Sequence, residues 1–270
     1  DLVDDFVRTV EEFEPDFMVV SCVEDTFLQA VKLVHSVLDR RIPTIFGGVF
    51  LTAVPELALS YEGVDMIGLQ EGEETLLEVA ERIRMGQPVD DVPSVWLKRA
   101  DGTVVRNPNG PLVDISASEY FSDFSLFDES RFNRPMGGQI FKTLPVETYR
   151  GCPYQCSFCN SPMQLKLARE SGRGSFLRKK TMANLAAKLR KLVGLYEPEF
   201  FYIVDDSFLA RSEDEVHDFV GMYKEFRLPF WFNTRPENVT PERLELLQEV
   251  GCYRISFGLE HGEKISNPKF

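Results

Sequence analysis

The chain has 270 residues, of which 43% are hydrophobic and 27% charged, and its formal net charge is −13. This balance predicts one large or two ordinary globular domains, and the acidic charge argues against a general nucleic-acid-binding protein. No apolar run approaches the ~20 residues of a transmembrane helix, and we find no signal peptide. Five cysteines, three of them clustered, are not a disulfide framework. We therefore expect a cytoplasmic enzyme; because the chain does not begin with Met, we also expect its natural start to lie upstream.

Residues 1–86 alternate between helical and strand-like patterns. Apolar spacing predicts a first helix that Pro15 ends, and a second helix that Asp25 or Thr26 caps. Further helices are predicted over residues 54–61 and 71–86, and buried strands over residues 16–22, 43–48 and 64–70. This order predicts a Rossmann-like, flavodoxin-like α/β domain with an open parallel sheet.

Ligands of such sheets bind at the carboxyl ends of the strands, where residues 21–26, 47–50 and 68–75 form loops. The pair Gly47-Gly48 permits the backbone to approach a ligand closely. The alternative is that this pair only turns the chain.

Residues 87–140 are predicted to connect two domains. Two strand-like runs flank Asp101-Gly102, which is a strong hairpin signal. The remainder is rich in turn formers and aromatic residues but lacks a helical or strand period, so we expect an ordered strap. Phe121, Phe124 and Phe127 are expected to anchor it in the core rather than to form a cofactor site.

Three cysteines fall within eight residues, in the segment Arg150 to Asn160 (RGCPYQCSFCN), with the spacing C-x3-C-x2-C. Thiolates are ligands for iron–sulfur clusters, zinc or copper(I). Three of them hold three corners of a four-iron cluster and leave one iron open, as reactive metal sites require. A structural zinc site needs a fourth ligand, and no Cys or His occurs among residues 160–209.

Residues 141–270 again alternate strand and helix. Strands are predicted over residues 141–149, 201–206, 230–237 and 252–260, and helices over residues 179–196, 212–226 and 240–251, with Ser212 and Thr240 as caps. This order after a cysteine-bearing loop predicts a partial parallel (β/α) barrel, with its site at the carboxyl ends of the strands.

The cysteine spacing, with Phe158 before the third cysteine, resembles the radical S-adenosylmethionine superfamily, in the branch with an upstream cobalamin-binding domain. The resemblance implies a 4Fe–4S cluster held by Cys152, Cys156 and Cys159, S-adenosylmethionine on the open iron, and a 5′-deoxyadenosyl radical as reagent. It also implies a chain cut at both ends, with domains over residues 1–86 and 141–270 joined by the connector 87–140.

The same resemblance assigns further residues to cofactors. Phe158, Asp206, Arg235, Ser256 and Glu260 are implied to bind S-adenosylmethionine; Asp206 is alternatively a helix cap or part of a surface pair with Asp205, and Arg235 a structural ion-pair partner. Cobalamin is implied at Ser21, Thr26, Gly47, Gly48, Glu71 and Gly72, although the histidine that the family places after Gly-Gly is absent here, with Phe50 instead.

The function implied is methylation of an unactivated carbon in a small-molecule substrate, with electrons from a donor such as flavodoxin or ferredoxin. An oxidative cyclase or a rearrangement catalyst of the same branch is the alternative among enzymes. A non-catalytic metal-binding module is the alternative from another class.

Overall fold

The computed structural model describes residues 1–116, 121–171 and 174–258. The chain forms two compact units, and each is described by itself. The first comprises Asp1–Val113 and Met163–Ser175, and the second comprises Asp114–Pro162 and Phe176–Phe270. None of the helices in the described ranges is long and apolar enough to cross a membrane.

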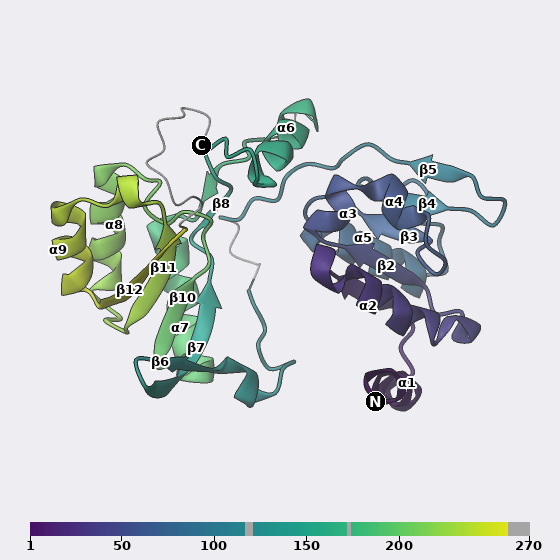
Figure 1. Ribbon diagram of the computed structural model, residues 1–270, viewed down its shortest axis with the longest axis horizontal. Helices are drawn as coiled ribbons and strands as arrows, with labels where there is room; N and C mark the ends of the chain where they lie inside the picture. Colours follow the sequence, from purple (N-terminus) through teal and green to yellow (C-terminus); the bar gives the residue numbers. More distant parts are fainter. Residues whose placement is uncertain (117–120, 172–173, 259–270) are drawn as a thin grey trace. The chain divides into compact units, whose positions relative to one another are not determined.

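The first unit contains a sheet of strand order β1-β2-β3-β4-β5 (Figure 1). The first three strands pair in parallel, which confirms the predicted open α/β sheet. The predicted hairpin at Asp101-Gly102 also forms, and it adds two antiparallel strands to the same sheet. The strands are β1 (Met18–Ser21), β2 (Thr44–Gly47), β3 (Met66–Gly68), β4 (Val95–Lys98) and β5 (Val104–Arg106).

Apart from the first, the helices of this unit pack apolar side chains into the clusters around the sheet. Phe27 from the second helix and Phe46 from β2 are both almost fully buried, and their rings meet edge to face at 6.4 Å. The helical elements are α1 (Leu2–Phe13), α2 (Glu24–His35), η1 (Leu38–Arg40), α3 (Val49–Ala53), α4 (Pro55–Leu59) and α5 (Glu73–Arg84).

Two local predictions in this unit were wrong. Helix α2 begins at Glu24, so neither Asp25 nor Thr26 is its cap; Thr26 lies in the first turn, where its hydroxyl accepts a hydrogen bond from the Val23 amide at 3.1 Å. The short helix α3 follows Gly48 directly, where a loop was predicted. Both errors concern element ends, which local pattern determines least well.

The second unit contains a sheet of strand order β12-β11-β10-β7-β6, and α7, α8 and α9 cover one face of it (Figure 1). Four strands pair in parallel, as a partial (β/α) barrel requires. The strands are β6 (Asn133–Met136), β7 (Gln139–Val146), β10 (Phe200–Ile203), β11 (Phe230–Thr234) and β12 (Cys252–Phe257). The helices are α7 (Met182–Tyr196), α8 (Glu213–Tyr223) and α9 (Pro241–Glu249).

Alternation along the strands separates the two faces of this sheet. Phe201 and Phe232 belong to the buried cluster that packs against the helices. The intervening residues lie on the opposite face, where the Tyr202 and Trp231 rings stack at 3.9 Å and the Asn233 amide donates to the Tyr202 hydroxyl at 2.8 Å. The helix-covered face therefore carries the core, and the other face carries polar and aromatic groups.

Several elements around this sheet differ from prediction. The strand predicted over residues 141–149 is two strands, because β7 ends at Val146 and a short strand β8 (Tyr149–Arg150) pairs with β9 (Arg178–Lys179). Helix α7 begins three residues later than predicted, where Thr181 caps it. Helix α6 (Ser161–Ser171) and the 3-10 turns η2 (Glu129–Phe132) and η3 (Pro236–Asn238) were not predicted.

The predicted strap is partly regular. Strand β6 pairs antiparallel with β7 at the sheet edge, where Pro135 is tolerated. Phe124 is buried, and its ring contacts Tyr196 at 5.6 Å, which confirms it as a core anchor. Phe121 packs against the same core, but Phe127 is 52% exposed, so its assignment as an anchor was wrong.

Candidate cofactor sites

The three clustered cysteines lie in an irregular segment between β8 and α6, residues 151–160, which we call the cysteine loop. Gly151 opens the loop with φ of 96°, and a Cβ atom there would stand 2.6 Å from the Phe176 carbonyl oxygen. Only glycine fits this left-handed position against a neighbouring backbone. The turn that starts the cysteine loop is therefore fixed by packing.

Each thiol has polar surroundings suited to a thiolate ligand. The Ser161 amide donates to Cys159 Sγ at 3.4 Å, and Arg235 Nη1 donates to Cys156 Sγ at 3.4 Å. Burial raises the pKa of the Cys152 thiol, and the charges of Asp206 and of the other two cysteines add to that rise, whereas a hydrogen bond from the Tyr154 backbone opposes it and favours the thiolate. Three sulfurs from one loop beside a guanidinium form a donor set that fits an iron–sulfur cluster.

Within the described residues, no three or more His, Cys, Asp and Glu side chains converge on a position for one metal ion. A four-iron cluster takes each thiolate on a different iron, and so needs its sulfurs further apart than a single ion does.

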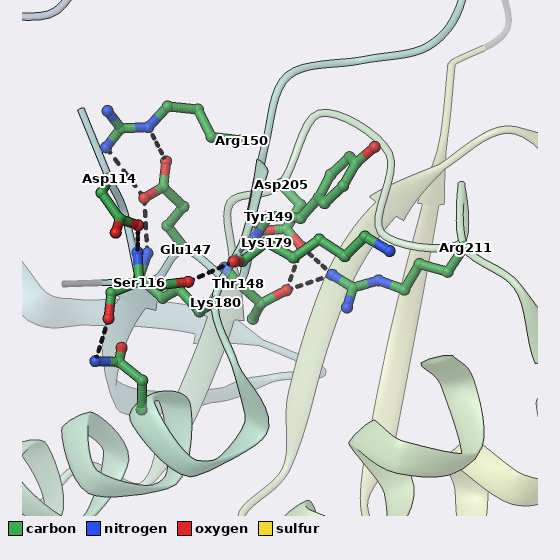
Figure 2. A network of polar contacts seen from close by, with 11 residues as sticks. Asp114, Ser116, Glu147, Thr148, Tyr149, Arg150, Lys179, Lys180, Asp205 and Arg211 are labelled. Atoms are coloured by element: carbon green, nitrogen blue, oxygen red, sulfur yellow. Dashed lines mark hydrogen bonds and ion pairs between the residues drawn. The ribbon is translucent and has the colours of Figure 1, made fainter. Parts of the chain in front are cut away.

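The two aspartates after β10 have different environments. Asp205 accepts hydrogen bonds from the Thr148 and Tyr149 amides at 2.7 and 3.0 Å, and it pairs with Arg211 Nη2 at 2.6 Å (Figure 2). The side chains of Asp205 and Arg211 are 0% and 2% exposed. Burial raises the pKa of the Asp205 carboxyl, while Arg211 and Thr148 act in the opposite direction. Asp205 thus fixes the backbone just before the cysteine loop.

Asp206 lies on the open side and is exposed. Partial burial of its carboxyl raises the pKa, and a hydrogen bond with the Ser161 side chain opposes that rise. Because Ser161 is the first residue after the cysteine loop, its contact with Asp206 places this carboxylate beside the loop. The residue is exposed, so a ligand can reach it. Of the two aspartates, it is the one placed to meet a cofactor.

Arg235 follows β11 and reaches the cysteine loop. Besides Cys156, its guanidinium forms an ion pair with Glu237 and lies over the Tyr154 ring, 4.3 Å from the centroid. The structural ion pair considered from the sequence therefore exists, and a role toward S-adenosylmethionine remains a proposal.

Of the other three residues expected near S-adenosylmethionine, Phe158 and Ser256 lie in the described part of the chain. Phe158 is 56% exposed, in the turn before Cys159. Ser256 is half-buried on β12, in register with Asn233 on β11. Glu260 lies outside the described residues.

In the first unit, Ser21 ends β1 and Gly47 ends β2, and the two are register partners. Gly48 has φ of 110°, and a Cβ atom there would stand 2.3 Å from the Cys22 carbonyl oxygen. The structure brings Ser21, Gly47 and Gly48 together at the carboxyl edge of the sheet. It also shows that Gly48 is required by the close approach of two backbones.

The remaining residues expected at cobalamin have local partners. Glu71 accepts a hydrogen bond from the Val113 amide at 2.7 Å, and Gly72 is the residue before α5. The Thr26 hydroxyl accepts a hydrogen bond from the Val23 amide and donates one to the Val23 carbonyl. Their assignment to cobalamin remains a proposal.

Sequence reasoning missed four residues that shape the cysteine loop: Thr148, Tyr154, Ser161 and Arg211. Tyr154 and Ser161 lie in or beside the cysteine motif, so their neighbourhood was a usable signal. Thr148 and Arg211 meet Asp205 only through the tertiary fold, and no pattern marks them.

Two family models match the parts of the chain that carry these residues. A family model described as the B12 binding domain matches residues 1–80, and one described as the radical SAM superfamily matches residues 146–268. Together with the fold and the cysteine loop, the two family models support a cobalamin-dependent member of the radical S-adenosylmethionine superfamily. The cofactors of this fold are a 4Fe–4S cluster, S-adenosylmethionine and cobalamin.

Individual relatives are distant. The chain is 24% identical to cytidylyl-2-hydroxyethylphosphonate methyltransferase of Streptomyces wedmorensis, over 96% of this chain and 52% of that protein. It is 23% identical to the anaerobic magnesium-protoporphyrin IX monomethyl ester cyclase of Rubrivivax gelatinosus, over 98% and 47%.

A solved structure of the radical S-adenosylmethionine methyltransferase TsrM from Kitasatospora setae has a TM-score of 0.68 to this chain. It is 17% identical, over 97% of this chain and 51% of that one. This likeness shows the fold. The chain spans about half the length of the curated relatives it matches.

Proposed function

We propose that the chain belongs to an enzyme that methylates an unactivated carbon of a small-molecule substrate. The observation that supports this most is the presence, in one chain, of a cobalamin-type domain and a cysteine loop at the mouth of a partial barrel. A methyltransferase among the relatives, aligned over nearly the whole chain, favours methyl transfer.

In this proposal Cys152, Cys156 and Cys159 hold the cluster. The cluster and S-adenosylmethionine, when bound there, would supply radical chemistry at the substrate carbon, and cobalamin would supply the methyl group. The protein's part is to bind, orient and exclude water.

Residues at the carboxyl ends of the barrel strands would orient S-adenosylmethionine. Asp206 offers an exposed carboxylate beside the cysteine loop, suited to the methionine amine. Ser256 offers a hydroxyl for the ribose, and Glu260 and Phe158 complete the proposed set. Arg235 lies beside this set, with Nη1 at Cys156 of the cysteine loop.

The proposed cobalamin site is the carboxyl edge of the first sheet. Ser21 and Gly47 stand side by side there, and Gly48 brings the following backbone close. Thr26 lies in the first turn of α2, which follows β1, and Glu71 and Gly72 lie between β3 and α5. The position agrees with the rule that open parallel sheets bind ligands at this edge.

The experiment is a product assay with S-adenosylmethionine labelled in its methyl group, using anaerobically reconstituted protein, cobalamin and a reductant such as flavodoxin or ferredoxin. Labelled product supports methyl transfer. A full yield of 5′-deoxyadenosine with unlabelled, cyclised or rearranged product contradicts it.

That second outcome is the alternative function, an oxidative cyclase or rearrangement catalyst without methyl transfer, and the cyclase relative favours it. Metal analysis tests the alternative from another class. About four irons per chain with a broad brown absorbance support an enzyme, whereas a colourless zinc-loaded protein would support a non-catalytic metal-binding module.

A further inference from the structure

Arg235 links the cysteine loop to the end of β11. Its Nη1 donates to Cys156 Sγ at 3.4 Å, and its Nη2 forms the ion pair with Glu237. Its guanidinium plane lies over the Tyr154 ring, with Cζ 4.3 Å from the centroid. Two of these three partners belong to the cysteine loop, so one side chain holds the loop at two points.

Tyr154 is fixed at its other end as well. Its hydroxyl donates to Asn238 Oδ1 at 2.6 Å, and the Asn238 carbonyl accepts from Arg243 Nη1 at 3.0 Å. Arg243 is 8% exposed, so this chain of contacts ends in the core. The cysteine loop is thereby tied to the segment between β11 and α9 through both the ring and the hydroxyl of Tyr154.

These contacts leave Arg235 poorly placed to grip a cofactor carboxylate. A bidentate guanidinium–carboxylate pair uses two neighbouring N–H groups that point the same way. Here Nη1 is directed to a sulfur and Nη2 to Glu237. A carboxylate would have to displace one of these partners.

The contact to sulfur has a chemical consequence. Reduction of an iron–sulfur cluster adds negative charge, which spreads onto its sulfur ligands. Hydrogen bonds and positive charge at those sulfurs stabilise the reduced form, and so raise the reduction potential. Arginine is always charged in proteins, so its effect does not depend on pH.

We propose that Arg235 is a positioning residue for the cluster: it holds Cys156 and Tyr154 in place and raises the reduction potential of the cluster that Cys156 binds. This inference rests on the proposed function, because it needs a cluster in the cysteine loop. It replaces the expectation that Arg235 pairs with the carboxylate of S-adenosylmethionine.

The test compares Arg235→Gln and Arg235→Lys with the unsubstituted chain. Arg254→Gln is the matched control, because Arg254 also lies over an aromatic ring, Trp231, and donates to a sulfur, Met136 Sδ, at 3.5 Å. That sulfur is a thioether outside the cysteine loop. Each protein is reconstituted anaerobically, assayed for iron, and titrated redox-potentiometrically with EPR detection, without S-adenosylmethionine.

We expect the midpoint potential of Arg235→Gln to be about 60 mV lower, which corresponds to a tenfold change in the equilibrium constant of one-electron reduction. The midpoint potential of Arg235→Lys should fall less, because the positive charge remains while the stacking on Tyr154 and the fork geometry of the guanidinium are lost. Arg254→Gln should match the unsubstituted chain. If Arg235→Gln binds markedly less iron while Arg254→Gln binds it fully, the positioning role is supported. The effect on the midpoint potential is then measured with Arg235→Lys.

Equal iron content and equal potential in all the proteins would overturn the inference. So would an Arg235→Gln protein whose only defect is weaker binding of S-adenosylmethionine. If the unsubstituted chain binds no 4Fe–4S cluster, the proposed function fails and this inference with it. The two failures are thus distinguished by the iron content of the unsubstituted chain.

Discussion

Asp205 and Arg211 form an ion pair of 2.6 Å, with both side chains almost completely removed from solvent. Asp205 also accepts hydrogen bonds from the backbone amides of Thr148 and Tyr149. The ion pair therefore joins the end of β10 to the backbone that leads into the cysteine loop. The neighbouring Asp206 takes no part in this pair and is exposed. Two adjacent aspartates therefore have separable roles, one in stability and one at the proposed cofactor site.

Asp205→Asn should lower the free energy of unfolding by about 3–5 kcal/mol, because it leaves the Arg211 charge buried without its partner. Urea denaturation measures this change. Asp206→Asn is the adjacent control and should lie within about 0.5 kcal/mol of the unsubstituted chain. Similar losses in the two variants would contradict the assignment.

Asp206→Asn should instead weaken the binding of S-adenosylmethionine to the reconstituted protein by roughly tenfold or more, because one charge-assisted hydrogen bond to the methionine amine is lost. Equilibrium dialysis with labelled S-adenosylmethionine measures the affinity. Unchanged affinity, with the cluster intact, would remove Asp206 from the site.

Alanine at Cys152, Cys156 or Cys159 should abolish the brown absorbance and most of the bound iron. Cys252→Ala is the control and should retain both. Burial raises the pKa of Cys252 to about 11, so at neutral pH it is a thiol rather than a thiolate ligand. Loss of iron in Cys252→Ala with retention in Cys159→Ala would be incompatible with the proposed ligand set.

Glu147 accepts from Lys180 Nζ at 2.8 Å and from Arg150 Nε at 2.7 Å (Figure 2). Burial raises the pKa of its carboxyl, but Arg150 and Lys180 together lower it by more, so the net shift is downward from 4.5. Glu147→Gln should therefore lower the free energy of unfolding at neutral pH by about 1–3 kcal/mol, since Lys180 is only 8% exposed.

The sign of the pH dependence follows from that shift. A carboxylate with a lowered pKa stabilises the fold above its ordinary pKa, and this contribution is lost as the pH falls through the lowered value. The deficit of Glu147→Gln should thus be full at pH 7 and shrink below about pH 4. Glu129→Gln is the control: Glu129 pairs with Lys142 but is 81% exposed, so its effect should be small at every pH. A pH-independent deficit would show that the two ion pairs are not its cause.

Gly48→Ala should destabilise the first unit by roughly 3 kcal/mol, because the new Cβ meets the Cys22 carbonyl and the backbone is left-handed. Gly102→Ala separates the two causes: Gly102 has φ of 82° but open space around it, so only about 1 kcal/mol of strain is expected. Chemical denaturation gives both values. Equal losses would mean that backbone strain alone, without the close approach to Cys22, explains Gly48.

The sequence by itself determined the features that depend on neighbouring residues. The three clustered cysteines lie within eight positions, so their spacing alone places them in one loop. Continuous apolar runs and caps such as Ser212 and Thr240 are equally local, and they predicted most strands and helices of both units. Strand β6 escaped notice because an edge strand accepts polar residues and Pro135, which blur the period.

Only the tertiary structure decided which of two equivalent residues does what. Asp205 and Asp206 follow the same strand, and the sequence does not say which one turns inward to Arg211. The sequence pattern places Arg235 at the carboxyl end of a barrel strand, near the proposed site. Its partners there, Tyr154 and Cys156, lie about eighty residues earlier in the chain. Such contacts depend on the direction of each side chain after folding. Local spacing predicts the element that a residue belongs to, and packing between distant elements selects its partner.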